Sequence, residues 1–485
     1  MVTTSLPTAP QPTTSPEDAA AFLTRMPDLE QALAFYHRHL APEDAIDLSV
    51  AENVLVYDHS MQKMVFDPLR PLPAPNIHYM SPYGTPELRQ QVAALLTRAF
   101  GLAERKPEEQ VQPEDVFGTA GVASALECLA FALKNEGPSE LPPPLVDGDG
   151  VLIPAPYWQG FNWSFEQRPK LTCVPVPLPT DGPHAFRLTL DLIKKQYEEH
   201  RKQTGKAPRL LVLTNPHNPL GVNYRKDLLE DIYAWALGST DMHIISDEIY
   251  CHSQLDCGTT PFTSAVALDA YATYPERIHV VWGFAKDFGL SGFRTGFVVS
   301  RNPVVQDAML GSKDPGAEQR HPMSWFTPFD SLKHYLIGAV LTAKGPEADL
   351  YTTYAMESYR PLLTDSFHQA KAALDKHGIR YVHRDGDNAA QFFWLDLREY
   401  LKWVAVPPNR TDPYPLTDPH LDDEEQNLFN YLRDAPTHVS LLPGGVMHSP
   451  TPGFFRLCYT AHQPAEVREA IDRVAEALSH LGPDK

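Results

Sequence analysis

The chain has few cysteines, a deficit of basic residues and no long apolar run. Its five cysteines are odd in number and form no C-x-x-C pair, which indicates neither a disulfide framework nor a zinc cluster, so no metal site is expected. The 41 basic residues stand against 61 acidic ones, a net charge of −20, which argues against a nucleic-acid or anionic membrane surface. Without a signal peptide or a membrane-spanning run, we expect a soluble, cytoplasmic protein.

The 485 residues exceed the size at which one hydrophobic core usually keeps growing, so a large domain and a smaller one are expected. Residues 1–64 are expected to hold a disordered Pro/Thr/Ser-rich tail and the N-terminal part of the small domain. The large, cofactor-binding domain would span residues 65–322, and the C-terminal part of the small domain residues 323–485. Two proline-containing stretches, 135–150 and 404–419, are expected to be surface loops.

Four apolar runs of strand length are each followed by a polar or aromatic motif and then by helix-like sequence. The runs are residues 151–153, 210–213, 243–245 and 279–282. Buried parallel strands alternating with helices give this rhythm, and ligands then lie beyond the carboxyl ends of the strands. We therefore expect an α/β fold in which a mostly parallel sheet brings the four motifs to one edge.

The last motif places Lys286 at the end of an apolar run, with Arg294 eight residues later. A lysine at a strand end inside a packed site is desolvated, which lowers its pKa and makes the amine usable as a nucleophile or base. A Schiff-base lysine requires this property. A lone Lys-Asp pair would equally suit an ordinary strand end, so the assignment depends on the other motifs.

The other motifs supply groups that would hold pyridoxal 5'-phosphate on Lys286. Asp247 would pair with the pyridine nitrogen and keep it protonated, so that the ring accepts electrons from the substrate. Asn218 and Tyr250 would hydrogen-bond the phenolate oxygen of the ring. Trp158 offers a flat face for stacking.

The phosphate of this cofactor would be held by Arg294 and by the start of a helix. Small residues at 118–124 would let an anion approach the backbone N–H groups of Val122 and Ala123, where the helix dipole adds to the attraction. Taken alone, these small residues would equally reflect close packing of a helix on a sheet.

From about Ile46 to the C-terminus, the chain resembles the fold type I pyridoxal-phosphate enzymes of aminotransferase class I/II. The shared motifs, N-P-x-N-P-x-G, S-D-E-I-Y and K-D-x-G-x-x-G-x-R, occur in the family's order. Within this class the chain is most similar to the 1-aminocyclopropane-1-carboxylate synthase branch. The segments that carry this likeness are 51–53, 156–161, 323–326, 393–398 and 452–458. The resemblance implies a seven-stranded type of sheet in the large domain and a smaller α+β domain.

The resemblance also implies roles for residues outside the four motifs. Arg456 would bind the substrate carboxylate through its planar fork. Glu52 matches a glutamate near the leaving group, where a carboxylate would attract a sulfonium cation. Tyr79 would reach the cofactor phosphate of a neighbouring subunit in a homodimer, and Tyr83 is a further candidate for substrate binding. Both tyrosines precede a helix, so simple packing on its flank is the alternative.

The chain departs from the family at positions that bind phosphate. Gly283 and Ala285 replace two hydroxyl residues, and each lost hydrogen bond to an anion would cost about 1.5–3 kcal/mol. We therefore expect looser cofactor retention or a substitute donor such as Thr119. Val54 stands where the synthases usually carry glutamine, which leaves the substrate open.

These residues predict an enzyme that removes the α-proton of an amino acid with the amine of Lys286. For S-adenosylmethionine, the resemblance implies γ-elimination of methylthioadenosine followed by ring closure, γ-substitution or annulation. Transamination with a 2-oxo acid and carbon–sulfur β-lyase activity are alternatives that use the same residues. A catalytically silent dimeric binding protein is a further alternative, but it would not need Lys286, Asp247 and Arg456.

Overall fold

A computed structural model of the chain describes residues 45–56, 73–310, 329–345, 349–382, 389–404, 422–434 and 436–482. The expectations for the N-terminal tail, for the motif at 323–326 and for nearly all of the loop at 404–419 lie outside these residues. Within the described ranges, no helix is both long enough and apolar enough to cross a membrane.

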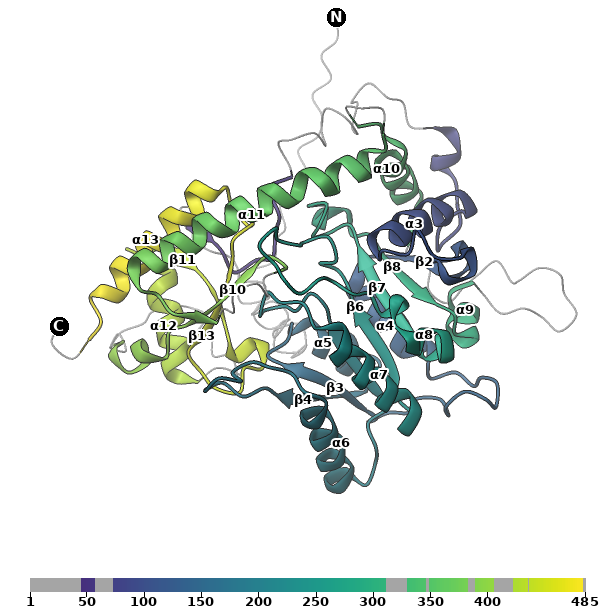
Figure 1. Cartoon of the computed structure of the whole chain (residues 1–485), viewed down its shortest axis with the longest axis horizontal. Helices are drawn as coiled ribbons and strands as arrows, with labels where there is room; N and C mark the ends of the chain where they lie inside the picture. The colour runs from purple at the N-terminus through teal and green to yellow at the C-terminus, as the bar shows by residue number, and fades with distance from the viewer. Residues whose placement is uncertain are drawn as a thin grey trace, which may run out of the picture.

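Among the described residues, a seven-stranded sheet forms the centre of the large domain (Figure 1). Its strands are Val116–Thr119 (β2), Gly150–Ala155 (β3), Thr172–Pro177 (β4), Leu210–Thr214 (β5), His243–Asp247 (β6), Ile278–Gly283 (β7) and Gly296–Ser300 (β8). They lie in the order β2-β8-β7-β6-β5-β3-β4. β4, β3, β5, β6 and β7 run parallel, whereas β8 is antiparallel to β7 and β2.

Successive residues of the central strands enter hydrophobic clusters on opposite faces of the sheet. In β6, for example, Ile244 belongs to one cluster and Ile245 to the other. The helices of this domain are Pro86–Ala99 (α3), Val122–Ala132 (α4), Gly160–Asn162 (α5), Leu190–Thr204 (α6), Lys226–Ser239 (α7), Asp269–Thr273 (α8), Pro303–Leu310 (α9) and Ser331–Thr342 (α10). Both faces are thus covered, as the continuous apolar runs predict.

The small domain combines the C-terminal part of the chain with residues 45–56. Its described strands are Ile46–Asp47 (β1), Tyr381–Val382 (β9), Phe392–Asp396 (β10), Val439–Ser440 (β11), Leu442–Pro443 (β12) and Phe454–Cys458 (β13). β12, β13, β10 and β9 form an antiparallel sheet, and β1 pairs in parallel with β11. Its helices are Tyr351–His377 (α11), Asp423–Arg433 (α12) and Pro464–Ser479 (α13).

Helix α11 connects the hydrophobic core of the large domain to that of the small domain (Figure 1). Tyr351 at its start packs in the core of the large domain, together with Ile337 of α10, whereas Tyr359 and Leu363 pack in the small domain. The expected boundary near residue 322 lies outside the described residues. We propose that the boundary falls within α11, which assigns α10 to the large domain.

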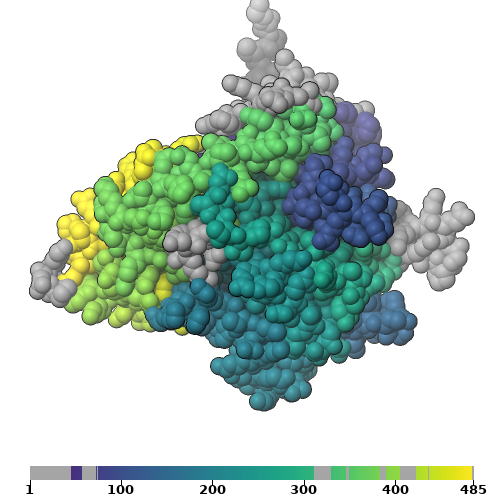
Figure 2. Space-filling view, in the orientation of Figure 1, coloured from purple at the N-terminus to yellow at the C-terminus, as the bar shows by residue number. Residues whose placement is uncertain are grey.

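The space-filling view shows the blue-to-teal large domain packed against the green-to-yellow C-terminal part (Figure 2). The four apolar runs of the sequence correspond to β3, β5, β6 and β7, which are parallel neighbours. This pairing confirms that the four motifs following them share one edge of the sheet. The expected loop at 135–150 lies mainly on the surface between α4 and β3.

Candidate active site

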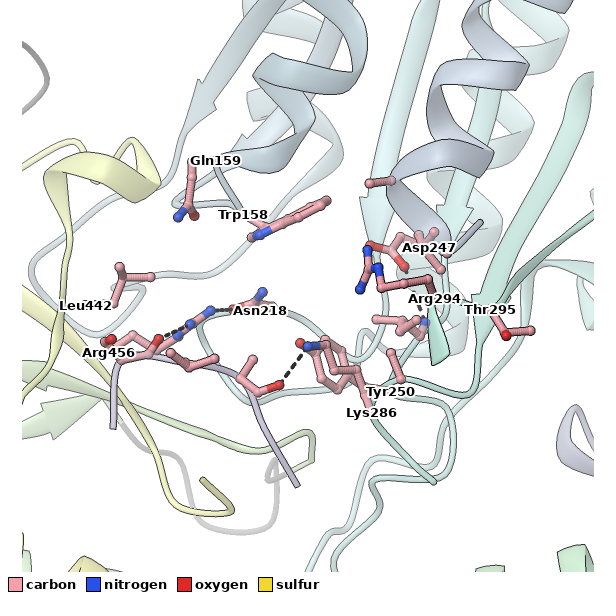
Figure 3. Close-up of a pocket in the computed structure, with 18 residues that line it drawn as sticks. Trp158, Gln159, Asn218, Asp247, Tyr250, Lys286, Arg294, Thr295, Leu442 and Arg456 are labelled. Atoms are coloured by element: carbon pink, nitrogen blue, oxygen red, sulfur yellow. Dashed lines mark hydrogen bonds between the residues drawn. The ribbon is translucent and has the colours of Figure 1, made fainter. Parts of the chain in front are cut away.

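A cavity of about 430 Å³ lies between this edge of the sheet and the small domain (Figure 3). Its described lining comprises Ser49, Val50, Ala51, Gly121, Val122, Ala123, Trp158, Gln159, Asn218, Asp247, Ile249, Tyr250, Ala285, Lys286, Arg294, Thr295, Leu442 and Arg456. The predicted site residues that it brings together are Val122, Ala123, Trp158, Asn218, Asp247, Tyr250, Lys286, Arg294 and Arg456. Residues of the 135–150 loop are not part of this lining.

Lys286 follows β7 and is half-buried in the cavity wall. Its Nζ donates a hydrogen bond to the carbonyl oxygen of Ala51 at 2.7 Å, and Asn53 Nδ2 donates to the carbonyl of Lys286 at 2.9 Å. Burial lowers the pKa of Lys286, although the charge of Glu52 acts in the opposite direction. The amine is therefore held away from bulk solvent and is easier to deprotonate than an exposed lysine.

Asp247 ends β6 and is only 4% exposed. Its Oδ1 accepts one hydrogen bond, from the backbone N–H of Ile249 at 3.3 Å. Burial raises the pKa of Asp247 to about 7, while that N–H and the charge of Lys286 partly lower it. A buried carboxyl that accepts so few hydrogen bonds is suited to pair with a cation, such as a protonated ring nitrogen.

Arg456, on β13, is buried, and its guanidinium lies at the end of the cavity opposite Asp247 (Figure 3). Its Nη1 donates to Asn218 Oδ1 at 2.9 Å and its Nη2 to the carbonyl oxygen of Ser49 at 2.5 Å. The guanidinium lies 4.6 Å from the centre of the Phe392 ring. Its buried Nε has no hydrogen-bond partner among the described residues, so the group retains capacity to bind a carboxylate.

Trp158 and Tyr250 form opposing aromatic walls of the cavity (Figure 3). A Cβ atom at Gly160 would lie 2.1 Å from the Trp158 ring, so only glycine lets the indole occupy this position. Tyr250 is 2% exposed and packs edge-on against Phe392, with ring centres 5.4 Å apart. The space between the walls suits a planar ring.

The start of α4 and Arg294 together form a site suited to an anion. Gly121 precedes the helix with a φ of 90°, and the first N–H groups, those of Val122 and Ala123, have no acceptor one turn earlier in the helix. A Cβ on Gly296 would lie 2.8 Å from the nitrogen of Val122, so glycine permits β8 to approach the helix start. A Cβ on Gly121 would come within 3.2 Å of Arg294 Nη2, so the arginine lies directly beside this turn.

The two positions that lack hydroxyl groups differ in the space around them. A Cβ on Gly283 would lie 2.6 Å from the carbonyl oxygen of Thr295, whereas Ala285 faces the cavity. Thr119 is fully buried, lies outside the cavity lining and donates its hydroxyl to the carbonyl of Gly121 at 3.1 Å. The expectation that Thr119 replaces the missing donors is therefore wrong, because its hydroxyl is already used within the turn.

Three other predicted residues lie outside the cavity lining. Glu52 accepts a hydrogen bond from the hydroxyl of Ser291 at 2.9 Å, beside rather than within the cavity. Tyr79 is fully exposed, as a residue awaiting a neighbouring subunit would be. Tyr83 is half-buried, with the guanidinium of Arg89 5.4 Å from its ring. The roles inferred for these three residues stay predictions.

Some lining groups were not predicted from the sequence. The carbonyl oxygens of Ser49 and Ala51 hold Arg456 and Lys286, but a backbone acceptor leaves no trace in residue type. Gln159 directly follows Trp158, and this position next to a predicted site residue could have indicated that it lines the cavity.

The donor set fits pyridoxal phosphate. The N–H groups of α4 and Arg294 would receive its phosphate, Asp247 its ring nitrogen, and Lys286 its aldehyde. Tyr250 would donate to its ring oxygen. These groups all line one cavity, and each has a chemical character that matches its part of the cofactor.

Comparisons with known proteins agree with this geometry. A family profile described as "Aminotransferase class I and II" matches residues 74–474. A 1-aminocyclopropane-1-carboxylate synthase from Nicotiana tabacum is 26% identical over 451 residues, which cover 90% of this chain and 80% of that protein. A "Probable inactive 1-aminocyclopropane-1-carboxylate synthase-like protein 2" from Mus musculus is 27% identical, covering 92% and 67%.

An aromatic aminotransferase of known crystal structure from Pyrococcus horikoshii shares the fold, with a TM-score of 0.63 and 21% identity over 93% of this chain and 99% of that one. The family match extends over most of the chain and includes the large-domain strands and the cavity residues Lys286, Asp247 and Arg456. The chain therefore belongs to the aminotransferase class I and II family of pyridoxal-phosphate-dependent enzymes.

Proposed function

We propose that this enzyme acts on S-adenosylmethionine, removing its α-proton and releasing methylthioadenosine from its γ-carbon. Ring closure or γ-substitution would complete the reaction. One observation carries the proposal: the amine of Lys286, the carboxyl of Asp247 and the guanidinium of Arg456 face a single cavity. The likeness to proteins named 1-aminocyclopropane-1-carboxylate synthase supports this choice of substrate.

Pyridoxal phosphate, when bound, supplies an electron sink for the α-carbon of an amino acid. The chain would hold the cofactor through Asp247, Arg294 and the start of α4, with Trp158 and Tyr250 enclosing the ring. The buried carboxyl of Asp247 would become a carboxylate beside a cation, because an opposite charge lowers the pKa that burial raises.

Arg456 would bind the substrate carboxylate, since its fork presents paired donors and burial keeps competing water away. Lys286 would take the α-proton on Nζ, because its lowered pKa favours the neutral amine. The carbonyl of Ala51, which accepts from Nζ at 2.7 Å, would orient the amine during this transfer.

The test is to incubate the purified holoenzyme with S-adenosylmethionine and to measure methylthioadenosine and the amino-acid product by mass spectrometry. Lys286→Ala is expected to lower the rate by about 10²–10⁴-fold and to change the visible absorbance of the cofactor. Lys195→Ala, at an exposed lysine of α6, is the matched control and should leave both unchanged. Unchanged turnover in Lys286→Ala would refute the proposed role of this lysine.

Transamination with a 2-oxo acid is the second candidate, and the charge of the cavity favours it. Asp247 is the only acidic residue in the described lining, and Glu52 lies outside it, so a sulfonium cation has no additional carboxylate there. A keto-acid product that requires an amino acceptor would identify a transaminase. Pyruvate released from a cysteine conjugate without an acceptor would instead identify the carbon–sulfur β-lyase.

A further inference from the structure

Gln159 occupies the cavity wall and has no part in the chemistry proposed above. Figure 3 shows its side chain beside Trp158, on the side of the cavity that also holds Leu442 and Arg456. Its amide Oε1 is enclosed, yet it has no hydrogen-bond partner among the residues that the structure describes. An enclosed amide oxygen without a donor is costly, because folding removed the water that would have bound it.

Three other uncharged polar residues of the described lining, Ser49, Asn218 and Thr295, already use their side chains in hydrogen bonds. Ser49 donates its hydroxyl to Asp47 at 2.5 Å, and Asn218 Oδ1 accepts from Arg456 at 2.9 Å. The hydroxyl of Thr295 donates to a backbone carbonyl at 3.2 Å. The unsatisfied oxygen distinguishes Gln159 from these three residues. Because the residue lines the cavity, a rotation of its amide would turn this oxygen toward a ligand.

The backbone on both sides of Gln159 is fixed by packing. Its own carbonyl accepts a hydrogen bond from the N–H of Asn162 at 3.1 Å. Trp158 before it packs edge-on against Phe161, and Gly160 after it has no room for a side chain beneath the indole. The amide is thus presented from a rigid turn, which is the arrangement that specific recognition requires.

The ends of the cavity fix which part of a substrate would meet Gln159. Arg456 would take the carboxylate, Lys286 would lie at the α-carbon, and Asp247 and Arg294 would hold the cofactor. Figure 3 shows Gln159 away from Lys286, Asp247 and Arg294, so its neighbour would be the substrate side chain.

We propose that Gln159 determines specificity by hydrogen-bonding a donor group at the far end of the substrate side chain. This proposal rests on the proposed function in that the cavity must bind an α-amino acid. An amide oxygen accepts from hydroxyl and amino groups. S-adenosylmethionine carries such donors on its ribose and adenine, whereas L-methionine has none beyond its α-carbon. A substrate without them would leave the amide unsatisfied and would bind less tightly.

The experiment titrates the cofactor absorbance of the holoenzyme with S-adenosylmethionine and with L-methionine. In Gln159→Leu, we expect the dissociation constant of S-adenosylmethionine to rise by about tenfold, with that of L-methionine unchanged. Gln159→Glu keeps an acceptor and should retain more affinity than Gln159→Leu. Gln167→Leu changes an exposed glutamine a short distance along the chain and should behave as the parent.

Equal weakening of both ligands in Gln159→Leu would indicate a structural role and overturn the proposal, as would no change in either. If the parent binds neither ligand, the proposed substrate is wrong. The same comparison is then made with L-glutamine and L-norleucine, of which only the first carries a terminal donor. Selective loss of L-glutamine binding in Gln159→Leu would support the proposal, and parallel behaviour would overturn it.

Discussion

Asp247 and Lys286, which we propose hold the same cofactor, show how burial acts on an acid and on a base. Burial raises the pKa of the carboxyl to about 7 and lowers that of the amine. Both shifts favour the uncharged form, because a low-dielectric site disfavours either charge. A larger fraction of the amine is thereby unprotonated and able to act as a nucleophile or base, whereas the carboxyl would gain its charge beside a cation.

Restoring a hydroxyl at position 285 should tighten cofactor binding, whereas doing so at position 283 should not. Ala285 faces the cavity, so Ala285→Ser adds a donor worth about 1.5–3 kcal/mol to a phosphate if its geometry is favourable. Gly283→Ser forces a Cβ to within 2.6 Å of a backbone oxygen and should lower the melting temperature. Cofactor fluorescence after dialysis measures the first effect, and thermal unfolding measures the second.

Equal cofactor retention in Ala285→Ser and the parent would show that the missing hydroxyl is not the limiting contact. Ala267→Ser, at a buried site away from the cavity, controls for the effect of adding a hydroxyl elsewhere.

At this scale the sequence predicted the groups whose chemistry is particular to their residue type. Lys286, Asp247 and Arg456 were identified because an amine, a carboxylate and a guanidinium each suit one part of the ligand. Gln159 was not, because an amide next to a tryptophan has no chemistry of its own until the fold encloses it. Thr119 was misassigned because its hydroxyl bonds two residues along the chain, which the sequence does not show.

At the scale of elements, the apolar runs predicted β3, β5, β6 and β7 but not the complete sheet. β8 runs antiparallel between β7 and β2, and its glycine lets it approach α4. Such pairing joins segments far apart in the chain, and no local pattern encodes the order of strands. The start of α4 was nevertheless placed correctly, because Gly121 and the apolar residues after it mark a helix boundary.

A pair of buried histidines joins β6 to β7. His243 Nδ1 lies 3.1 Å from His279 Nε2, and His279 Nδ1 lies 2.8 Å from the hydroxyl of Ser300 on β8. Burial lowers the pKa of His279 to about 3 and that of His243 well below its usual value. Both imidazoles therefore stay neutral in the folded protein.

This pair should make folding less favourable as the pH falls below about 6.5, the pKa of an unperturbed histidine. There the unfolded chain takes up protons that the folded chain excludes, which costs about 1.4 kcal/mol per pH unit for each histidine. His279→Gln should therefore show a shallower fall in melting temperature than the parent between pH 7.5 and 5.5. Parallel curves would contradict this prediction, and the exposed His184→Gln is the control.

The comparison with a variant is needed because buried carboxyls act in the opposite direction. Burial raises the pKa values of Asp247, Glu248, Asp287 and Glu425 to about 7. These groups make the folded state more favourable as the pH falls through that value, since the folded protein then binds the extra protons. The difference between the parent and the variant in the pH dependence of the melting temperature therefore isolates the contribution of the histidines.

At the scale of the whole molecule, the two domains both line the cavity and also contact each other outside it. Arg398 of the small domain contacts Asp181 of the large domain at 2.8 Å, and the hydroxyls of Thr180 and Thr451 lie 3.1 Å apart. The exposed ion pair contributes little by itself, because solvent screens it. Its position nevertheless shows where the domains meet outside the active site.

The exposed Tyr79 leads to a prediction about assembly. If it reaches the site of a neighbouring subunit, Tyr79→Ala should weaken cofactor binding although the residue lies outside its own cavity. Mixing Tyr79→Ala with Lys286→Ala subunits should then restore activity, because one site per mixed dimer regains both side chains. No recovery after subunit exchange, with dimers verified by sedimentation, would place Tyr79 outside the shared site.

Helix α11 has a consequence for any rotation of the small domain relative to the sheet. It is rooted in both cores, and Pro361 within it lacks the N–H that would complete one helical hydrogen bond. A rotation of the small domain would therefore tilt or bend this helix. Arg456 and Ala51 would move with the small domain, whereas Lys286 and Asp247 would stay with the sheet. The bend angle of α11 would then set the distance between the two pairs, and with it the length of the amino acid that fits.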